Sequence, residues 1–124
     1  MTASTLNGTR ILIVEDNFVV ADALRFMLTG YGGIVTAIVP NRELALAALA
    51  TDPVDVAILD INLNGTSVVP LAEELRAQAV PFVFLTGYGD EAVLPEHLRA
   101  SPRFDKPVEV ELLVRCLLEV TRRS

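Results

Sequence analysis

The stretch Arg10-Ile11-Leu12-Ile13-Val14-Glu15-Asp16 is a short apolar run, rich in β-branched residues, that ends in two adjacent carboxylates. The run does not alternate with polar residues, which is typical of a strand buried on both faces of a parallel sheet. Similar runs occur at residues 34–39, 54–59 and 81–85, and residues 103–105 are counted as a short fifth strand. The stretch therefore predicts one strand of a parallel sheet, with acidic side chains at its carboxyl end.

Segments with helical spacing of apolar residues lie between these runs. Apolar residues at i, i+4, i+7 and i+8 indicate amphipathic helices. Such segments cover about 20–28, 44–50, 68–79 and 108–120, and a weaker one follows Gly89. Their candidate N-caps are Asp16 or Asn17 for the first, Asn41 for the second, and Thr66 or Ser67 for the third. Strand and helix alternate five times, which predicts an α/β fold with a doubly wound five-stranded parallel sheet and helices on both faces.

The composition limits the class of protein. The chain has 124 residues, of which 52% are hydrophobic and 21% charged, so we expect a single domain over 1–124 with its core at about 10–121. No apolar run approaches the roughly 20 residues that span a bilayer, and the first eight residues lack the features of an export signal. We therefore expect no membrane contact and a cytoplasmic location.

Charge and cysteine content exclude further kinds of site. The formal net charge of −6 disfavours binding to nucleic-acid phosphates. The chain has one cysteine, Cys116, and one histidine, His97, too few for an internal disulfide or a Cys/His zinc site. We expect Cys116 to be a core or interface thiol and His97 to lie on the surface.

Polar residues follow four of the predicted strands at the edge where parallel strands end. Glu15 and Asp16 follow the first strand, Asp60 the third, Thr86 the fourth and Lys106 the fifth. Ligand sites in such sheets lie beyond the carboxyl ends of the strands. Carboxylates about 4 Å apart repel by roughly 4 kcal/mol at an effective dielectric near 20, so this cluster calls for a cation. Mg²⁺ prefers such oxygen ligands, often together with a phosphate.

The same residues suit chemistry at phosphorus. An aspartate beside a divalent cation can act as a nucleophile and form an aspartyl phosphate. Thr86 can donate a hydrogen bond to a phosphoryl oxygen, and Lys106, the only lysine in the chain, can supply a compact positive charge. The Lys106-Pro107 bond is a candidate for the cis form in the turn after the last strand.

With these residues placed, the chain resembles the receiver domains of two-component response regulators over residues 10–121. The resemblance implies the flavodoxin-like strand order 2-1-3-4-5. It implies that Asp60 accepts the phosphoryl group and that Glu15, Asp16, Asp60 and the carbonyl of Asn62 hold Mg²⁺. Thr86 would be the switch hydroxyl and Lys106 the phosphate-binding lysine. Such a domain catalyses its own phosphotransfer and dephosphorylation rather than turning over a small substrate.

Two details refine the resemblance. The motif Phe84-Leu85-Thr86-Gly87-Tyr88 is similar to the Phe-Ala-Thr-Gly-Gly/Tyr motif of a subgroup of single-domain regulators known mainly from alphaproteobacteria. Arg103 stands where receivers usually carry an aromatic switch residue, three positions before the lysine. We therefore expect Tyr88 to act with Thr86 in switching, and Phe104 to face the core.

The resemblance also implies the partners. A sensor histidine kinase would donate the phosphoryl group, and a histidine phosphotransferase or a downstream protein would receive the signal. The last helix carries more apolar surface than one core-facing side needs, which indicates a partner surface or a homodimer there. The alternatives are a receiver-like binding module that is never phosphorylated, an aspartate-nucleophile phosphatase and a flavin mononucleotide carrier. The phosphatase would need its nucleophile after the first strand, and Glu15 and Asp16 would repel a flavin phosphate.

Overall fold

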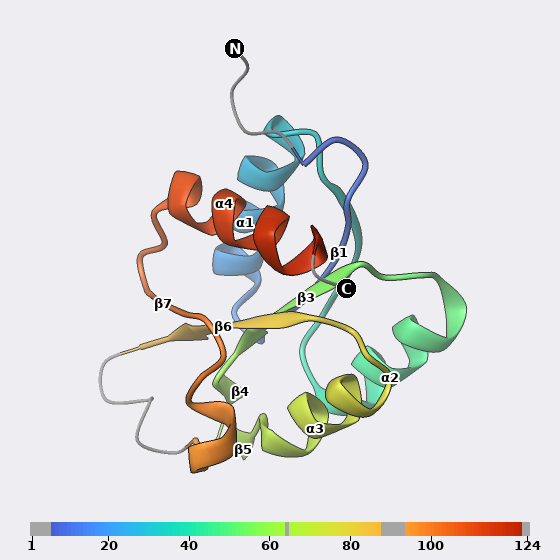
Figure 1. Ribbon diagram of the computed structural model, residues 1–124, viewed down its shortest axis with the longest axis vertical. Coiled ribbons are helices and arrows are strands. Elements are labelled where there is room, and N and C mark those ends of the chain that lie inside the picture. The colour runs from blue at the N-terminus through green and yellow to red at the C-terminus, as the bar shows by residue number, and fades with distance from the viewer. Residues whose placement is uncertain (1–5, 64, 88–93, 123–124) are drawn as a thin grey trace.

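The computed structural model describes residues 6–63, 65–87 and 94–122, and their centre is a parallel sheet (Figure 1). The sheet has the strand order β2-β1-β3-β6-β7, which is the predicted order 2-1-3-4-5. Its strands are β1 (Arg10–Val14), β2 (Ile34–Val39), β3 (Val56–Asp60), β6 (Phe82–Thr86) and β7 (Arg103–Asp105). All four neighbouring pairs are parallel. The fold class predicted from the apolar runs is therefore confirmed.

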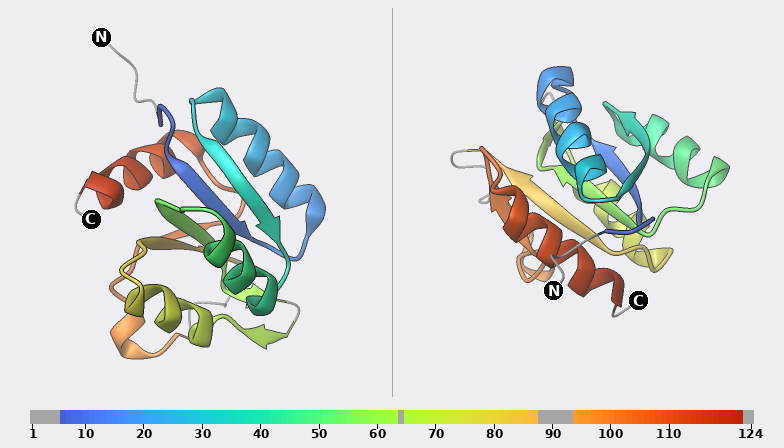
Figure 2. Two further views of the ribbon diagram at one scale, coloured as in Figure 1. Left: turned by 90° about the vertical axis from the view of Figure 1, so that its right-hand side faces the viewer. Right: turned by 90° about the horizontal axis from the view of Figure 1, so that it is seen from above.

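Helices cover both faces of this sheet. They are α1 (Phe18–Gly30), α2 (Arg42–Thr51), α3 (Val69–Ala77) and α4 (Val110–Arg122). Helices α1 and α4 lie on one face, and α2 and α3 lie on the other (Figures 1 and 2). Among the described residues, no helix is both long and apolar enough to span a membrane.

Each face of the sheet packs against its own apolar core. Leu12, Leu59 and Phe84 belong to the cluster shared with α2 and α3. Ile13 and Ile58, one position away along their strands, belong to the cluster shared with α1 and α4. Successive side chains of a strand point to opposite faces, so a strand between two helical layers must be apolar at every position. This is why the central strands β1, β3 and β6 appear in the sequence as apolar runs.

The helix N-termini match the predictions in two cases of three. Asn17 Oδ1 accepts hydrogen bonds from the backbone N–H groups of Val19 and Val20 at 3.0 and 3.2 Å. Asn41 Oδ1 accepts from Leu44 N at 2.9 Å. These contacts satisfy backbone donors that the first helical turn leaves unpaired.

The predicted cap of α3 is wrong, because Val68 occupies the N-cap position. Thr66 and Ser67 form the short strand β5, which pairs antiparallel with β4 (Asn62–Leu63). Gly65 closes this hairpin with φ of +83°, a conformation that favours glycine, and its N–H donates to Asn62 Oδ1 at 2.9 Å. Ser67 still helps the helix start, since its Oγ accepts from Val69 N at 3.1 Å.

The segment between β6 and β7 contains little regular structure where it is described. The expected weak fourth helix falls partly on residues 88–93, which lie outside the described residues. From residue 94 onward the chain forms only the 3-10 turn η2 (Glu96–Leu98) before β7. Leu94 and Leu98 are buried and anchor this segment to the core on the α2 and α3 side.

Candidate functional site

The carboxyl ends of the central strands bring three acidic side chains together. Glu15 follows β1 and is 2% exposed, and Asp60 ends β3 and is 3% exposed, whereas Asp16 is exposed. Carboxylate oxygens of these three residues all lie within 4.8 Å of one another. The structure therefore places the predicted acidic residues in one cluster at the predicted edge of the sheet.

Lys106 joins this cluster from the end of β7. Its Nζ lies 3.1 Å from Oδ2 of Asp60 and 3.1 Å from Oε1 of Glu15. Burial alone would lower the pKa of Lys106, but its contacts with Asp60 and Glu15 outweigh this effect and raise the pKa. The Lys106-Pro107 bond is cis, as the sequence suggested. The lysine is thus a fully charged bridge between two buried carboxylates.

Backbone groups hold the carboxylates in place. The N–H of Asn17 donates to Oε2 of Glu15 at 3.1 Å, and the N–H of Asn62 donates to Oδ1 of Asp60 at 3.1 Å. The second contact brings the backbone of Asn62 beside Asp60. Burial, followed by a hydrogen bond with Asp60, raises the pKa of Glu15 to about 7. The raised pKa shows that Lys106 and the backbone donors do not fully offset the negative charge of the cluster.

Thr86 lies at the edge of this site but points elsewhere. It is 1% exposed, and its hydroxyl donates a hydrogen bond of 2.8 Å to Oδ1 of Asp105. Sequence reasoning did not identify Asp105 as a site residue. Asp105 comes directly before Lys106, and this position could have revealed it. Parallel pairing of β6 with β7 sets Asp105 opposite Thr86.

Phe104 faces the core as predicted, and Arg103, which stands at the position of the usual aromatic switch residue, lies at the surface. Arg103 is exposed at the start of β7. Phe104 is half-buried and packs against the core shared with α1 and α4. Tyr88 lies outside the described residues, so its role in switching stays a prediction.

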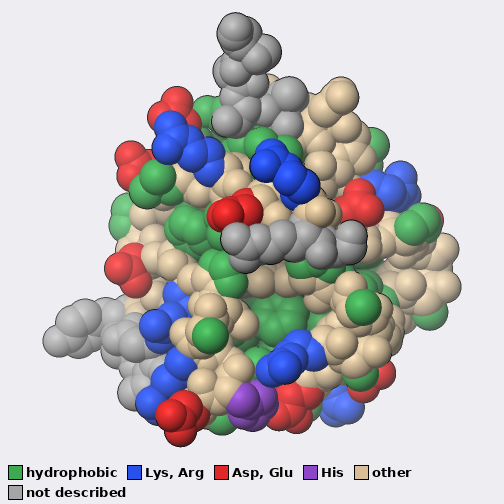
Figure 3. Space-filling view, in the orientation of Figure 1, with side chains coloured by type: hydrophobic (Ala, Val, Ile, Leu, Met, Phe, Trp, Pro, Cys, Tyr) green, Lys and Arg blue, Asp and Glu red, His purple; other side chains and the backbone are tan. Residues whose placement is uncertain are grey.

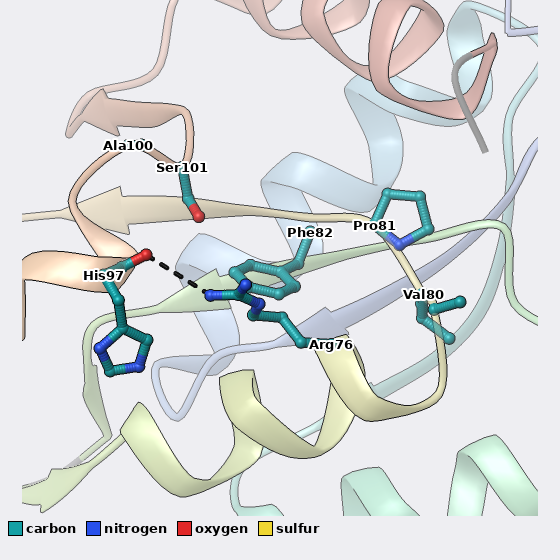
Figure 4. A pocket seen from close by; sticks show the side chains of 8 residues that line it. Arg76, Val80, Pro81, Phe82, His97, Ala100 and Ser101 are labelled. Carbon is teal, nitrogen blue, oxygen red and sulfur yellow. Dashed lines mark hydrogen bonds between the residues drawn. The ribbon is translucent and has the colours of Figure 1, made fainter.

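An open pocket of about 470 Å³ lies away from this cluster. Figure 4 shows Phe82 and Pro81, at the amino end of β6, with Arg76 and His97 at its rim. The nitrogen Nη1 of Arg76 lies 3.5 Å from the carbonyl oxygen of His97. Figure 3 shows a hollow floored by hydrophobic side chains next to the histidine. The pocket lies at the opposite end of β6 from Thr86 and includes none of the clustered acids.

Comparisons with known proteins show the family of the chain. Residues 11–117 match the response regulator receiver domain. The chain is 33% identical over 119 residues to the sensory transduction protein RegX3 of Mycobacterium tuberculosis, covering 94% of this chain and 52% of RegX3. It is 32% identical over 118 residues to the transcriptional regulatory protein CseB of Streptomyces coelicolor, covering 93% of this chain and 50% of CseB. The chain thus spans about half the length of these curated relatives.

A solved structure has a similar fold. The solution structure of SdrG from Sphingomonas melonis Fr1 superposes with a TM-score of 0.79 at 34% identity, covering 94% of this chain and 98% of SdrG. Strand order, the acidic cluster and the matched residues all lead to one assignment. The chain belongs to the response regulator receiver domain family.

Proposed function

We propose that this chain accepts a phosphoryl group on the carboxylate of Asp60 in two-component signalling. The observation that carries the proposal is the meeting of Glu15, Asp16, Asp60 and Lys106 at one edge of the sheet. Asp60 and Glu15 are both buried, and each has Lys106 near one oxygen and a backbone donor on the other. Asp60 is proposed as the acceptor because it ends the third strand, where the resemblance to receiver domains implies the phosphorylated aspartate. Its contacts hold the carboxylate in one orientation for attack.

The residues at the site fit Mg²⁺. Oε1 of Glu15 is buried and makes no hydrogen bond, although Lys106 lies within ion-pair distance. A hard cation would satisfy this oxygen, with Glu15, Asp16, Asp60 and the carbonyl of Asn62 as its protein ligands. When bound, Mg²⁺ would offset the charge that builds up on the carboxylate and the phosphoryl oxygens.

The proposed reaction is an in-line transfer to Asp60. A carboxylate oxygen of Asp60 forms a bond to phosphorus while the bond from phosphorus to an imidazole nitrogen of the donor breaks, and the electron pair stays on that nitrogen. Lys106 neutralises a phosphoryl oxygen by charge, and Thr86 can donate its hydroxyl proton in a hydrogen bond to another. Hydrolysis of the aspartyl phosphate returns the carboxylate.

The donor is a phosphohistidine of a sensor histidine kinase in this proposal. The phosphorylated chain passes the signal to a histidine phosphotransferase or to a downstream protein target. It can also signal by forming a homodimer through α4. The sequence motif at residues 84–88 supports membership of the Phe-Ala-Thr-Gly-Gly/Tyr subgroup. A switch role of Tyr88 together with Thr86 belongs to this proposal too, and a cytoplasmic location is consistent with it.

Mass spectrometry after treatment with a small acyl phosphate tests the proposal. We expect a single adduct of one phosphoryl group that requires Mg²⁺ and is lost in Asp60→Asn. Asp52→Asn is a matched control, because Asp52 is an exposed aspartate at the end of α2. An unmodified wild-type chain would support the alternative of a binding module, and an adduct that persists in Asp60→Asn would overturn the assignment of Asp60.

A further inference from the structure

The hydroxyl of Thr86 is held on β7 rather than over the acidic cluster. Thr86 ends β6 and pairs in register with Asp105, the last residue of β7. Its Oγ1 donates to Oδ1 of Asp105 at 2.8 Å, while the residue itself is 1% exposed. A hydrogen bond to a carboxylate is stronger than one between neutral groups. The resting structure therefore commits this hydroxyl to Asp105.

A threonine hydroxyl has one proton to donate, and a carboxylate can only accept. Thr86 cannot donate to Asp105 and to a phosphoryl oxygen on Asp60 at the same time. The two acceptors therefore compete for a single proton. This argument rests on the proposed phosphorylation of Asp60, because only that modification supplies the second acceptor.

We propose that Asp105 is a positioning residue that restrains Thr86 in the unphosphorylated state and releases it when Asp60 is modified. The backbone contact between the strands need not change, since the N–H of Lys106 donates to the carbonyl oxygen of Thr86 at 2.9 Å. Only the side-chain hydrogen bond would be exchanged. Phosphorylation would then leave the exposed carboxylate of Asp105, on β7, without its hydrogen bond from Thr86.

The side chains of β7 favour this route. Arg103 and Asp105 are exposed, whereas Phe104 between them packs into the core on the α1 and α4 side. Alternation along a strand sets Arg103 and Asp105 on the same face, away from Phe104. Among the three residues of β7, Asp105 is the one with a side-chain hydrogen bond to Thr86. Asp105 thus links the site to β7. The face of β7 that carries Asp105 has Arg103 in place of an aromatic ring.

Binding of beryllofluoride in the presence of Mg²⁺ tests the proposal, with affinity measured by titration calorimetry. Beryllofluoride mimics a phosphoryl group on an aspartate without a covalent transfer. Asp105→Ala removes the competing acceptor, so we expect binding about three- to tenfold tighter than in the wild type. Asp105→Asn keeps an oxygen acceptor but loses the charge, and we expect a smaller gain. Asp105 is exposed, so both variants should fold.

The loss of the negative charge of Asp105 could by itself strengthen binding of the anionic beryllofluoride. Two controls separate this charge effect from the release of the Thr86 hydroxyl. Glu109→Ala removes an exposed acid close by in the chain, and we expect a smaller change than in Asp105→Ala. In a Thr86→Val background, which lacks the hydroxyl, Asp105→Ala should cause no greater change than Glu109→Ala. The difference between the two backgrounds measures the coupling between Thr86 and Asp105.

The methyl resonance of Thr86 provides a second readout. In unliganded Asp105→Ala it should shift toward its position in the beryllofluoride-bound wild type. Equal gains with and without the Thr86 hydroxyl, or a Thr86 resonance that Asp105→Ala leaves in place, would overturn the role of Asp105. A wild-type chain that binds no beryllofluoride at Asp60 would instead overturn the proposed function, and this inference with it.

Discussion

Lys106 Nζ lies 3.1 Å from Oδ2 of Asp60, although the two residues are 46 positions apart in the chain. The contact spans the carboxyl ends of β3 and β7, with β6 between them in the sheet. The lysine also meets Glu15 at 3.1 Å, so a single ammonium group offsets two buried carboxylates. Its removal should affect stability as well as phosphoryl chemistry.

Lys106→Met should lower the free energy of unfolding by about 1–2 kcal/mol at pH 8 without Mg²⁺, because Glu15 and Asp60 would then face each other without a cation. Urea denaturation measures the loss. Mg²⁺ should restore part of it, since the ion can take over the role of the ammonium group. Arg103→Met is the control, because Arg103 is an exposed cation on β7, three residues before Lys106, and it should change stability by less than about 0.5 kcal/mol. Equal stability of the two variants would contradict this account.

Gly30, the last residue of α1, and Gly33, three residues later, should respond in opposite directions to alanine. A Cβ on Gly33 would lie 3.0 Å from Cδ1 of Ile11 and 3.1 Å from the carbonyl oxygen of Leu28. Gly33→Ala should therefore cost about 1–3 kcal/mol through overpacking. A Cβ on Gly30 would have no neighbour within 4 Å, and Gly30→Ala should be neutral or stabilise by up to about 1 kcal/mol. Thermal denaturation of both variants tests the contrast.

The two adjacent leucines of α4 should differ in their effect on folding. Leu113 is fully buried, whereas Leu112 is 49% exposed. Leu113→Ala should cost about 2–5 kcal/mol because it leaves a cavity between α4 and the sheet. Leu112→Ala should cost less than about 1 kcal/mol, which makes Leu112 the better position for testing a partner surface or a homodimer. Urea denaturation compares the two, and similar losses would show that Leu112 is buried in solution.

The sheet and the cluster of site residues could be predicted from the sequence for a physical reason. Strands between two helical layers must be apolar at every position, so β1, β3 and β6 appear as unbroken runs. The ends of parallel strands meet at one edge, so the polar residues that follow them must lie close together. That is how Glu15 and Asp60 could be paired without a structure.

The rest depends on contacts that no local pattern encodes. The strands β4 and β5 have two residues each, too few to show any periodicity in the sequence. Because Thr66 and Ser67 belong to this hairpin, α3 begins later than predicted, with Val68 as its N-cap. The hydroxyl of Thr86 could be assigned to the site but not oriented. Its direction depends on Asp105, which reaches it only through the register of two strands 17 or more residues apart in sequence.

Binding of Mg²⁺ should weaken as the pH falls through 7. Burial and the hydrogen bond with Asp60 raise the pKa of Glu15 to about 7 in the metal-free chain, and a protonated carboxyl is a poor ligand for the ion. The ionised fraction of Glu15 falls about tenfold between pH 8 and pH 6, so affinity should fall by about the same factor. Calorimetric titration at the two pH values measures the change, and Glu15→Gln should bind more weakly with a flatter pH dependence.

The same pKa shift predicts the opposite trend for stability without metal. The pKa of Glu15 is about 7 in the folded chain and 4.5 as its ordinary value, so between these values the folded chain binds more protons than the unfolded chain. The contribution of Glu15 to the free energy of unfolding should therefore rise by about 1 kcal/mol as the pH falls from 8 to 6. Urea denaturation in chelator measures it as the difference between the wild type and Glu15→Gln. With saturating Mg²⁺ the contribution of Glu15 should instead fall as the pH is lowered, because the ion stabilises the ionised form. Parallel pH profiles for the two proteins in chelator would show that Glu15 is already ionised at pH 6.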